Sequence, residues 1–342
     1  MNAEARRITF PTVRSEPASG RPGTDAGGAN VALDLTGAII AIRNNEPVVL
    51  AVRGAGDTAD ALPSGRFAPG SHVSLDAGLR ECVREKTALE LGYVEQLCTF
   101  GGCRSGARDG NSVSIGYVAL MLGGDRAPGA ASCTWRSVYD YFPWEDWRHD
   151  RPRVLREVIE PRLKAWAVAG EAENGDASAQ DRNERVNISF GLDGVRWDDE
   201  RVLDRYDLLC EAGALTSELL APPQPGLAAG AFGQTMNAEH RRILAAAIGR
   251  LRAKIRYRPV VFELMQAEFT LFDLQKTVEA ILGPNLHKQN FRRLVESVGL
   301  VEPTGEIRTH TGGRPARLYR FRREVLLERP APGVRVKAVA RG

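Results

Sequence analysis

Apolar and polar positions near the C-terminus follow the period of two consecutive helices. Over residues 271–282 the apolar side chains recur every three to four positions and form one stripe. Thr270 and Asp273 stand where a capping box would start this helix, and a Gly-Pro pair at 283–284 ends it. The helical pattern resumes over residues 287–298, which predicts a second helix after a short turn.

The second predicted helix carries hydrogen-bond donors opposite its apolar side. Its apolar positions recur between Phe291 and Val298 and can face a core. Amide, ammonium and guanidinium groups on the other side are the types that read base edges and bind phosphates in a major groove. Arg293 is the donor that a rotation of the helix by one residue would turn toward the core. The candidates for DNA contact are Lys288, Gln289, Asn290, Arg292 and Arg293.

A basic hairpin is predicted after the second helix. Its arms span residues 307–310 and 316–321, with two glycines at 312–313 as the tip. The order of helix, donor-rich helix and basic hairpin is that of a winged helix-turn-helix, which binds double-stranded DNA. The alternative is a basic, solvated helical domain with a surface hairpin. The hairpin candidates for DNA contact are Arg308, Arg314 and Arg317.

The N-terminal half reads as strands arranged around one helix. Residues 30–54 predict two strands joined by a turn at Asn44-Asn45. After a loop rich in turn residues, residues 72–91 have a helical pattern, and two more strands separated by a polar loop follow up to residue 124. This order predicts an α+β sandwich rather than a doubly wound sheet.

The middle of the chain is predicted to be mainly helical. Trp144 and Trp147 fall on one side of a helix, where core packing is the expected role and base stacking the alternative. An amphipathic helix runs up to Trp166, and residues 169–184 have the low hydrophobicity of a flexible loop. A short strand and a helix that ends near Gly213 should follow.

A long helix is predicted from residue 239 to residue 257. Leu244, Ile248, Leu251 and Ile255 form a stripe along it, and such a stripe packs either within its own domain or on a second copy of the chain. We favour a homodimer, because two copies would present two DNA-reading helices to a palindromic operator. Burial in the core of a single chain is the alternative.

The charge distribution separates the two halves of the 342-residue chain. The formal net charge is only +3, but roughly +12 falls on residues 241–342 and roughly −9 on the first 240. A basic C-terminal unit on an acidic body suits a DNA-binding module attached to a sensor or an enzyme.

The composition also bears on compartment and order. The five cysteines contain no CxxC pair, so we expect neither a structural zinc site nor a disulfide framework. No apolar run has the length of a membrane span and no signal segment opens the chain, so we expect a cytoplasmic protein without a membrane partner. Residues 1–29 have too few large apolar side chains to form a core and are predicted to be a disordered arm.

The region around the helix at 72–91 follows the spacing of the Nudix box, G-x5-E-x7-R-E-U-x-E-E-x-G-U. The match breaks where two adjacent glutamates belong, because Ala88 and Leu89 occupy those positions. A shift of one residue recovers only Glu90. The positions that keep the spacing are Gly70, Asp76, Arg84 and Glu85.

The lost glutamates matter because Nudix hydrolases hold divalent metal with several carboxylates from one helix. We expect the remaining carboxylates to form a solvated acidic face, with no catalytic residues and no metal site. The alternative is an active Nudix hydrolase of ADP-ribose or dinucleotides, with an appended DNA-binding domain. Asp76, Glu81 and Glu85 would then be its metal ligands.

Together these segments resemble the Nudix-related transcriptional regulators of NAD metabolism, the NrtR family, and in particular its NadQ-like branch. The eroded box runs into ELGYVEQLCTFG and DYFPWEDWR, and the later segments GRLRAKIRYRPVVFELM, FTLFDLQKTVEAILG, LHKQNFRRLVESVGLVEPTG and GGRPARLYRF carry the more specific part. The resemblance extends from about Val31 to Phe321. This chain departs from it in the lost glutamates and in an insertion between about Gly170 and Asn187.

The resemblance implies an α+β protein in which a Nudix-like α/β/α sandwich precedes a C-terminal winged helix-turn-helix. It further implies a homodimeric repressor that binds operators of NAD biosynthesis or salvage genes and senses a nucleotide such as NAD, ADP-ribose or ATP, with no required cofactor. A general architectural or single-strand binder is a third possibility. The expected boundaries are an arm at 1–29, a sensing and dimerisation domain at 30–258, the DNA-binding domain at 259–330 and a tail at 331–342.

Candidate effector contacts lie around the box helix and its neighbouring loops. Arginines can fork onto a pyrophosphate, and a phenylalanine can stack on adenine or nicotinamide. Each of them could instead be a surface charge or a core aromatic. The candidates are Arg53, Arg66, Phe67, Arg84, Phe100 and Arg104.

Overall fold

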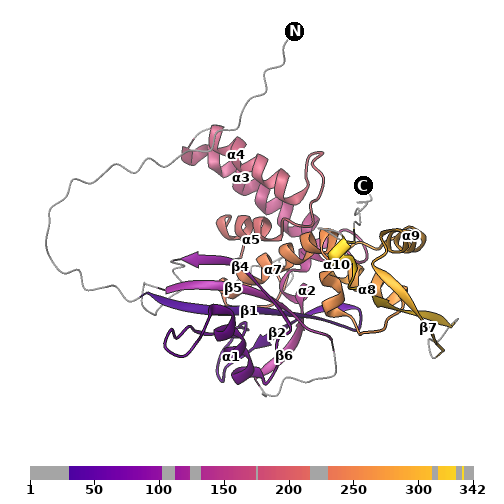
Figure 1. The fold of residues 1–342 in the computed structure, drawn as a ribbon. Coiled ribbons are helices and arrows are strands. Elements are labelled where there is room, and N and C mark those ends of the chain that lie inside the picture. The colour runs from indigo at the N-terminus through magenta and orange to yellow at the C-terminus, as the bar shows by residue number, and fades with distance from the viewer. Residues whose placement is uncertain are drawn as a thin grey trace, which may run out of the picture.

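A computed structural model describes residues 31–101, 112–123, 132–174, 176–215, 230–309, 315–328 and 333–334. In these residues a sheet is covered by helices on both faces, and a smaller unit with a two-stranded hairpin lies at one end of the sheet (Figure 1). The predicted disordered arm at 1–29 and nearly all of the predicted tail lie outside the described residues.

The larger part is built on one mixed sheet. Its central strand β1 (Ala32–Arg43) runs parallel to β5 (Ser112–Leu120) and antiparallel to β2 (Glu46–Val52). The strand order is β4-β5-β1-β2-β6, and the short β3 also pairs with β1. β1 and β5 are nearly continuous apolar runs because both faces of the sheet are covered. The outer strands are β3 (Ser64–Arg66), β4 (Tyr93–Gly101) and β6 (Cys133–Ser137).

The hairpin between β1 and β2 confirms the predicted turn. Asn44 and Asn45 have φ of 51° and 61°, the left-handed pair that a two-residue type I′ turn requires. Asparagine tolerates this conformation better than most residues, so the two asparagines explain why the chain reverses here.

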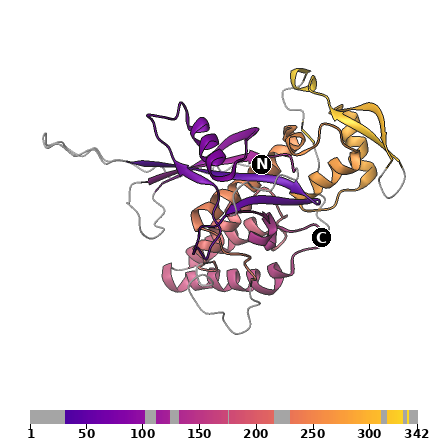
Figure 2. The same ribbon diagram turned by 90° about the horizontal axis from the view of Figure 1, so that it is seen from below.

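The two faces of the sheet carry different helices (Figures 1 and 2). α1 (Leu75–Thr87) packs Leu79 and Val83 into the apolar cluster of one face. α7 (Ala238–Tyr257) lies on the other face, and its Ile243 packs so closely over β5 that a side-chain carbon at Gly116 would come within 3.0 Å of it.

The long insertion is helical, contrary to the predicted loop at 169–184 and the short strand after it. α3 (Glu160–Asn174) and α4 (Asp176–Phe190) pack side by side, anchored by the buried Leu163 and Val186. The segment is rich in Ala and Glu, which are good helix formers, so low hydrophobicity alone is a poor indicator of a loop.

The tryptophans before this insertion do not share a helix face, contrary to the prediction. The helix α2 (Val138–Tyr141) is followed by a single 3₁₀ turn, η1 (Pro143–Glu145). Trp144 is fully buried and packs edge-on against Phe142 in the core, as expected from its aromatic character. The elements on either side are η2 (Leu155–Ile159), which is a π-helical turn, and α5 (Val202–Glu211).

The apolar stripe of the long helix is buried within the single chain. Leu244, Ile248, Leu251 and Ile255 are all at most 4% exposed. The prediction that this stripe packs on a second copy is therefore wrong, because the chain's own core covers it. The homodimer stays a prediction, and this stripe no longer supports it.

The smaller unit has the predicted order of two helices and a hairpin. α8 (Leu271–Leu282) and α9 (Lys288–Val298) are followed by β7 (Val301–Arg308) and β8 (Ala316–Phe321). β7 starts earlier than predicted, and its pairing with β8 is irregular between Pro303 and Ile307. η3 (Val260–Leu264) precedes α8, and α10 (Val325–Glu328) follows the hairpin.

This unit shares an apolar core with the larger part of the molecule. Leu274, Val278 and Ile281 of α8 belong to the same buried cluster as Leu244 and Leu251 of α7. The boundary predicted at residues 258–259 therefore does not separate two hydrophobic cores. No helix in the described ranges is long and apolar enough to cross a membrane.

Candidate nucleic-acid interface and effector site

One face of α9 is anchored in the core and the other is open. Phe291 and Val295 are buried and hold the helix against α8, as the sequence pattern predicts. The guanidinium of Arg292 donates to Glu296 at 2.9 Å, and this bond raises the pKa of Arg292 above its ordinary value. The predicted donors Lys288, Gln289, Asn290, Arg292 and Arg293 are all exposed on this helix.

The turn before α9 is held from within the unit. The buried carboxylate of Glu279 accepts hydrogen bonds of 2.8 Å from the backbone N–H of Leu286 and from the amide of Gln275. Gln275 also donates to the carbonyl of Leu286 at 2.9 Å, and Lys276 pairs with Glu279 at 2.8 Å. These bonds make the end of α8, the turn and the start of α9 one rigid piece.

The hairpin is fixed to the start of α8. The predicted capping box is present, because Thr270 and Asp273 exchange hydrogen bonds of 2.9 and 3.1 Å. The same Asp273 carboxylate accepts from Arg308 at 2.9 Å, so this wing candidate is partly engaged within the protein. Arg317 is exposed on β8, whereas Arg314 lies outside the described residues.

The predicted effector residues do not converge on one point. Arg66 and Arg84 are exposed, and Phe67 packs on the cluster beneath α1 and against His72. Phe100 lies beneath α7, where the Arg242 guanidinium stands 4.3 Å above its ring. These residues therefore divide between the two faces of the sheet.

The last two effector candidates are placed differently again. Arg53 is bound to the buried carboxylate of Asp60, with a nitrogen 2.8 Å from it. The hydroxyl of Tyr141 donates to the same carboxylate at 2.6 Å. Arg104 lies outside the described residues.

A groove of about 260 Å³ separates the β1–β2 turn from the smaller unit. Asn44, Asn45, Glu268, Asp273 and Arg308 are among its polar lining residues. None of the described effector candidates lines it, so it offers a different place for a ligand from the one predicted.

The eroded box sits on α1, which ends earlier than predicted. The helix stops at Thr87, and Ala88 takes the left-handed conformation of a C-cap with φ of 57°. Leu89, which replaces a box glutamate, is buried in the apolar cluster beneath α1. A carboxylate at position 89 would therefore be enclosed by apolar side chains.

The remaining acidic side chains of α1 are engaged with basic ones or exposed. Asp76 pairs with Arg80 at 2.8 Å, and Glu81 lies 3.6 Å from His72. Glu85 is exposed. Across the described ranges, no group of three or more His, Cys, Asp and Glu side chains is arranged to hold a metal ion.

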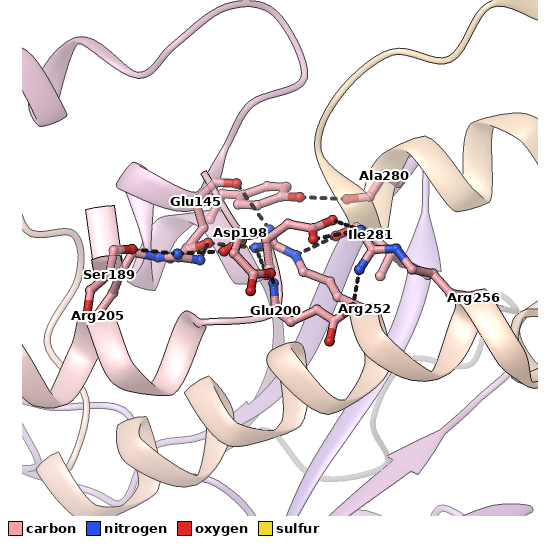
Figure 3. A network of polar contacts seen from close by, with 11 residues as sticks. Glu145, Ser189, Asp198, Glu200, Arg205, Arg252, Arg256, Ala280 and Ile281 are labelled. Atoms are coloured by element: carbon pink, nitrogen blue, oxygen red, sulfur yellow. Dashed lines mark hydrogen bonds and ion pairs between the residues drawn. The ribbon is translucent and has the colours of Figure 1, made fainter. Parts of the chain in front are cut away.

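Among the residues that the structure describes, the most deeply buried charges lie where the larger part meets the smaller unit (Figure 3). Glu145 is fully buried and accepts bonds of 2.6 Å from both Arg205 of α5 and Arg252 of α7. Burial alone would raise the pKa of Glu145, but the two guanidinium groups outweigh burial and lower it. Arg205 also donates to the carbonyls of Ser189 and Asp198 at 3.0 and 2.8 Å.

Two donors of the body reach the end of α8. The Tyr139 hydroxyl donates to the carbonyl of Ala280 at 2.7 Å, and Arg252 Nε donates to the carbonyl of Ile281 at 2.9 Å. A third bond of 2.8 Å joins the Asn285 amide to the carbonyl of Arg148. Sequence reasoning missed this junction, although the quoted segment DYFPWEDWR contains two of its residues, Glu145 and Arg148.

Comparison with known proteins identifies the smaller unit. Residues 261–321 match the NrtR DNA-binding winged helix domain. The ADPR responsive transcriptional repressor NtrR of Acinetobacter baylyi is 45% identical over 83 residues, which are 24% of this chain and 33% of that protein. The match thus spans about a third of the length of that relative.

The whole fold has a counterpart of known structure. Shewanella oneidensis NrtR, crystallised with a 27mer DNA, aligns over 86% of this chain and 94% of its own, with a TM-score of 0.51 and 21% identity. The NUDIX domain of the same protein, solved with ADP-ribose, aligns over 35% of this chain with a TM-score of 0.31, too distant to locate a ligand here. The fold is thus a Nudix-like α/β/α sandwich followed by a winged helix-turn-helix, as predicted.

Proposed function

We propose that this chain, a Nudix-related regulator of the NrtR type, represses genes of NAD biosynthesis or salvage by binding their operators. The observation that carries the proposal is the outer face of α9, where five exposed donors project from a helix anchored by Phe291 and Val295. This face belongs to a winged helix domain of a DNA-binding family, and the Acinetobacter relative is a transcriptional repressor.

The DNA contacts divide by chemistry. Gln289 and Asn290 carry amides that can read adenine edges, and Arg293 can fork onto guanine. Lys288 and Arg317 are suited to phosphate, since a lysine is a point charge on a flexible stem and the wing runs along the backbone. Arg292, Arg308 and Arg314 complete the proposed set.

Fluorescence anisotropy with the full chain tests this proposal. Labelled promoter DNA from NAD synthesis genes is compared with a scrambled duplex at physiological salt. Specific binding should be at least about 1,000-fold tighter than binding to the scrambled duplex. Equal affinity for both, falling steeply with salt, would favour a general architectural binder and reject the operator proposal.

The effector proposal is a nucleotide, with ADP-ribose as the first candidate and NAD and ATP as the others. The Acinetobacter relative is described as ADPR responsive, and the NUDIX domain of the Shewanella protein was crystallised with ADP-ribose. We propose Arg53, Arg66, Phe67, Arg84, Phe100 and Arg104 as candidate contacts. Because the candidates that the structure describes divide between several surfaces, individual substitutions must decide which of the six bind.

Calorimetric titration of Arg53→Ala with ADP-ribose is the first of these tests. The variant should bind the nucleotide more weakly while its effector-free operator affinity stays unchanged. Lys164→Ala is a control, because this lysine lies on α3 and belongs to none of the proposed sites. Unchanged nucleotide affinity in Arg53→Ala would remove Arg53 from the site.

We further propose that the Nudix-like domain does not hydrolyse nucleotides. Support comes from Ala88 and Leu89, which stand where the box needs carboxylates, and from the apolar surroundings of Leu89. Incubation with ADP-ribose or dinucleotides and Mg²⁺ or Mn²⁺ should give no turnover above buffer. Turnover that disappears in Glu85→Gln would establish the hydrolase instead.

The proposed assembly is a homodimer with domains at 30–258 and 259–330, which places two α9 helices on a palindromic operator. Sedimentation velocity at micromolar concentration should give the mass of two chains. A single-chain mass that persists when operator DNA is bound would reject the dimer.

A further inference from the structure

The end of α8 is the point at which the body holds the winged helix. The last carbonyls of any helix lack partners within the helix and need donors from elsewhere. Here the carbonyls of Ala280 and Ile281 receive the Tyr139 hydroxyl and Arg252 Nε (Figure 3). A guanidinium is suited to this position, because the C-terminus of a helix carries partial negative charge.

The body side of this contact is rigid. Arg252 uses its other donors on the carboxylate and the carbonyl of Glu145, at 2.6 and 3.1 Å, and on the carbonyl of Asp199 at 3.1 Å. Glu145 is held in turn by Arg205. Every member of this set is fully buried or nearly so. The bonds within the body therefore fix the orientation of the Arg252 guanidinium independently of its bond to Ile281.

The winged-helix side is equally rigid. Glu279 and Gln275 lock the turn at Leu286 to α8, so a displacement of the end of α8 moves the start of α9 with it. The Asn285 amide bound to the Arg148 carbonyl adds a second attachment on the turn itself. The donor face of α9 begins only two residues after Leu286.

The helix that carries Arg252 also contacts one candidate effector residue, Phe100. Near its other end, Arg242 stacks on Phe100, and His240 Nδ1 accepts the backbone N–H of Leu62 at 3.0 Å. The 12 residue-to-residue steps from His240 to Arg252 span about 18 Å of α-helix. α7 thus connects the proposed sensing region with the carbonyl that fixes the DNA-reading helix.

We infer that Tyr139 and Arg252 are positioning residues for α9, and that through them the state of the Nudix-like domain sets operator affinity. This rests on the proposed function. Neither residue touches DNA; each acts through a carbonyl of α8. Loss of one bond should loosen the turn and weaken the response to the effector, while the fold and the donor face of α9 stay intact.

The variant Tyr139→Phe removes the hydroxyl and keeps the ring. Tyr206→Phe is its matched control, because the buried Tyr206 hydroxyl donates to the carbonyl of Ala238 at 2.9 Å wholly within the body. Both variants should lower the melting temperature by similar small amounts. Only Tyr139→Phe should change the winged helix.

The first measurement is amide hydrogen exchange of the full chain without ligand. Peptides that cover residues 283–298 should exchange roughly 2–10-fold faster in Tyr139→Phe, as expected from the loss of one hydrogen bond, and at the wild-type rate in Tyr206→Phe. Unchanged exchange in Tyr139→Phe, or an equal increase in both variants, overturns the inference. This measurement does not depend on the identity of the operator or the effector.

The second measurement is the ratio of operator affinities with and without saturating ADP-ribose. If the wild type binds operator and its affinity changes with ADP-ribose, the ratio for Tyr139→Phe should be roughly 2–10-fold closer to one than the wild-type ratio. Tyr206→Phe should keep the wild-type ratio. A wild-type ratio in Tyr139→Phe overturns the inference and leaves the proposed function standing. If the wild type does not bind operator, the proposed function fails, and hydrogen exchange still decides whether Tyr139 positions α9.

Discussion

Replacing Glu145 by glutamine removes the negative charge at the centre of the junction. Glutamine has nearly the same shape, so the change leaves packing almost untouched. It leaves the buried guanidinium groups of Arg205 and Arg252 facing a neutral amide instead of a carboxylate 2.6 Å away. Desolvated cations without a counter-charge are strongly unfavourable, and the fold must rearrange or lose stability.

The magnitude follows from the burial of all three side chains. Removing one partner of a buried ion pair costs about 3–5 kcal/mol. Backbone carbonyls also accept hydrogen bonds from the two arginines and replace part of the hydration that the charges lose on burial. We therefore expect a loss at the lower end of this range, about 3 kcal/mol. A loss of this size is a large share of the roughly 5–15 kcal/mol that stabilises a typical protein.

Urea unfolding of the full chain at pH 7 measures this loss. Glu200→Gln is the matched control, because Glu200 pairs with Arg256 at the surface and its loss should cost less than about 1 kcal/mol. A loss below about 1 kcal/mol in Glu145→Gln would refute the reasoning, because the arginines would then need no carboxylate.

The free energy of unfolding measured at acid pH gives an independent check. The folded-state pKa of Glu145 is lowered, so its stabilisation is complete above the unfolded pKa of about 4.3 and is lost as the pH falls through the folded value. Glu145→Gln should therefore lose stability less steeply than the wild type below about pH 4. An identical acid slope in the two proteins would contradict the lowered pKa.

Three further outcomes are expected. Glu296→Gln should tighten DNA binding roughly 2–5-fold in anisotropy titrations, because it frees the Arg292 guanidinium and removes a negative charge from the DNA-reading face. Asp273→Ala should cost about 1 kcal/mol of unfolding free energy in thermal denaturation, because Thr270 loses its capping partner. The pKa of His240 is lowered to about 4 by burial, so the stabilisation from its neutral form is complete above about pH 6.5 and is lost as the pH falls toward 4. His240→Gln should therefore make the free energy of unfolding depend less on pH between these two values.

The sequence predicted those elements whose signals are local. The caps, the Gly-Pro stop and the apolar period of α8 and α9 lie within a few residues of one another, and the structure has both helices within one residue of the prediction. The β1–β2 turn follows from two adjacent asparagines. Which DNA and effector residues bind is still a prediction, because exposure alone does not identify a contact.

The junction could not be predicted in this way, because its contacts join distant residues. Glu145 lies 60 residues from Arg205 and 107 from Arg252, and nothing in the local pattern pairs them. A charged residue after Pro143-Trp144 reads as solvated in sequence, but in the fold it is fully buried and paired with arginines of α5 and α7. The loop wrongly predicted at 169–184 has a different cause. Its helix propensity was visible in the local sequence, but the prediction gave more weight to its polar composition.

The fully buried ion pairs of this domain lie away from its box helix. In a hydrolase the box helix brings carboxylates together around metal, but here Glu85 of α1 is exposed and Leu89 fills an apolar cluster. Glu145 is instead a fully buried carboxylate, and it pairs with arginines of α5 and α7 next to the winged helix. Apolar side chains of similar volume often stabilise a fold as well as a buried ion pair does, so we infer that the charges of this junction serve to define its geometry. That geometry ends on the carbonyl of Ile281, and any state of the body that shifts α7 must therefore move α8 or break the bond from Arg252.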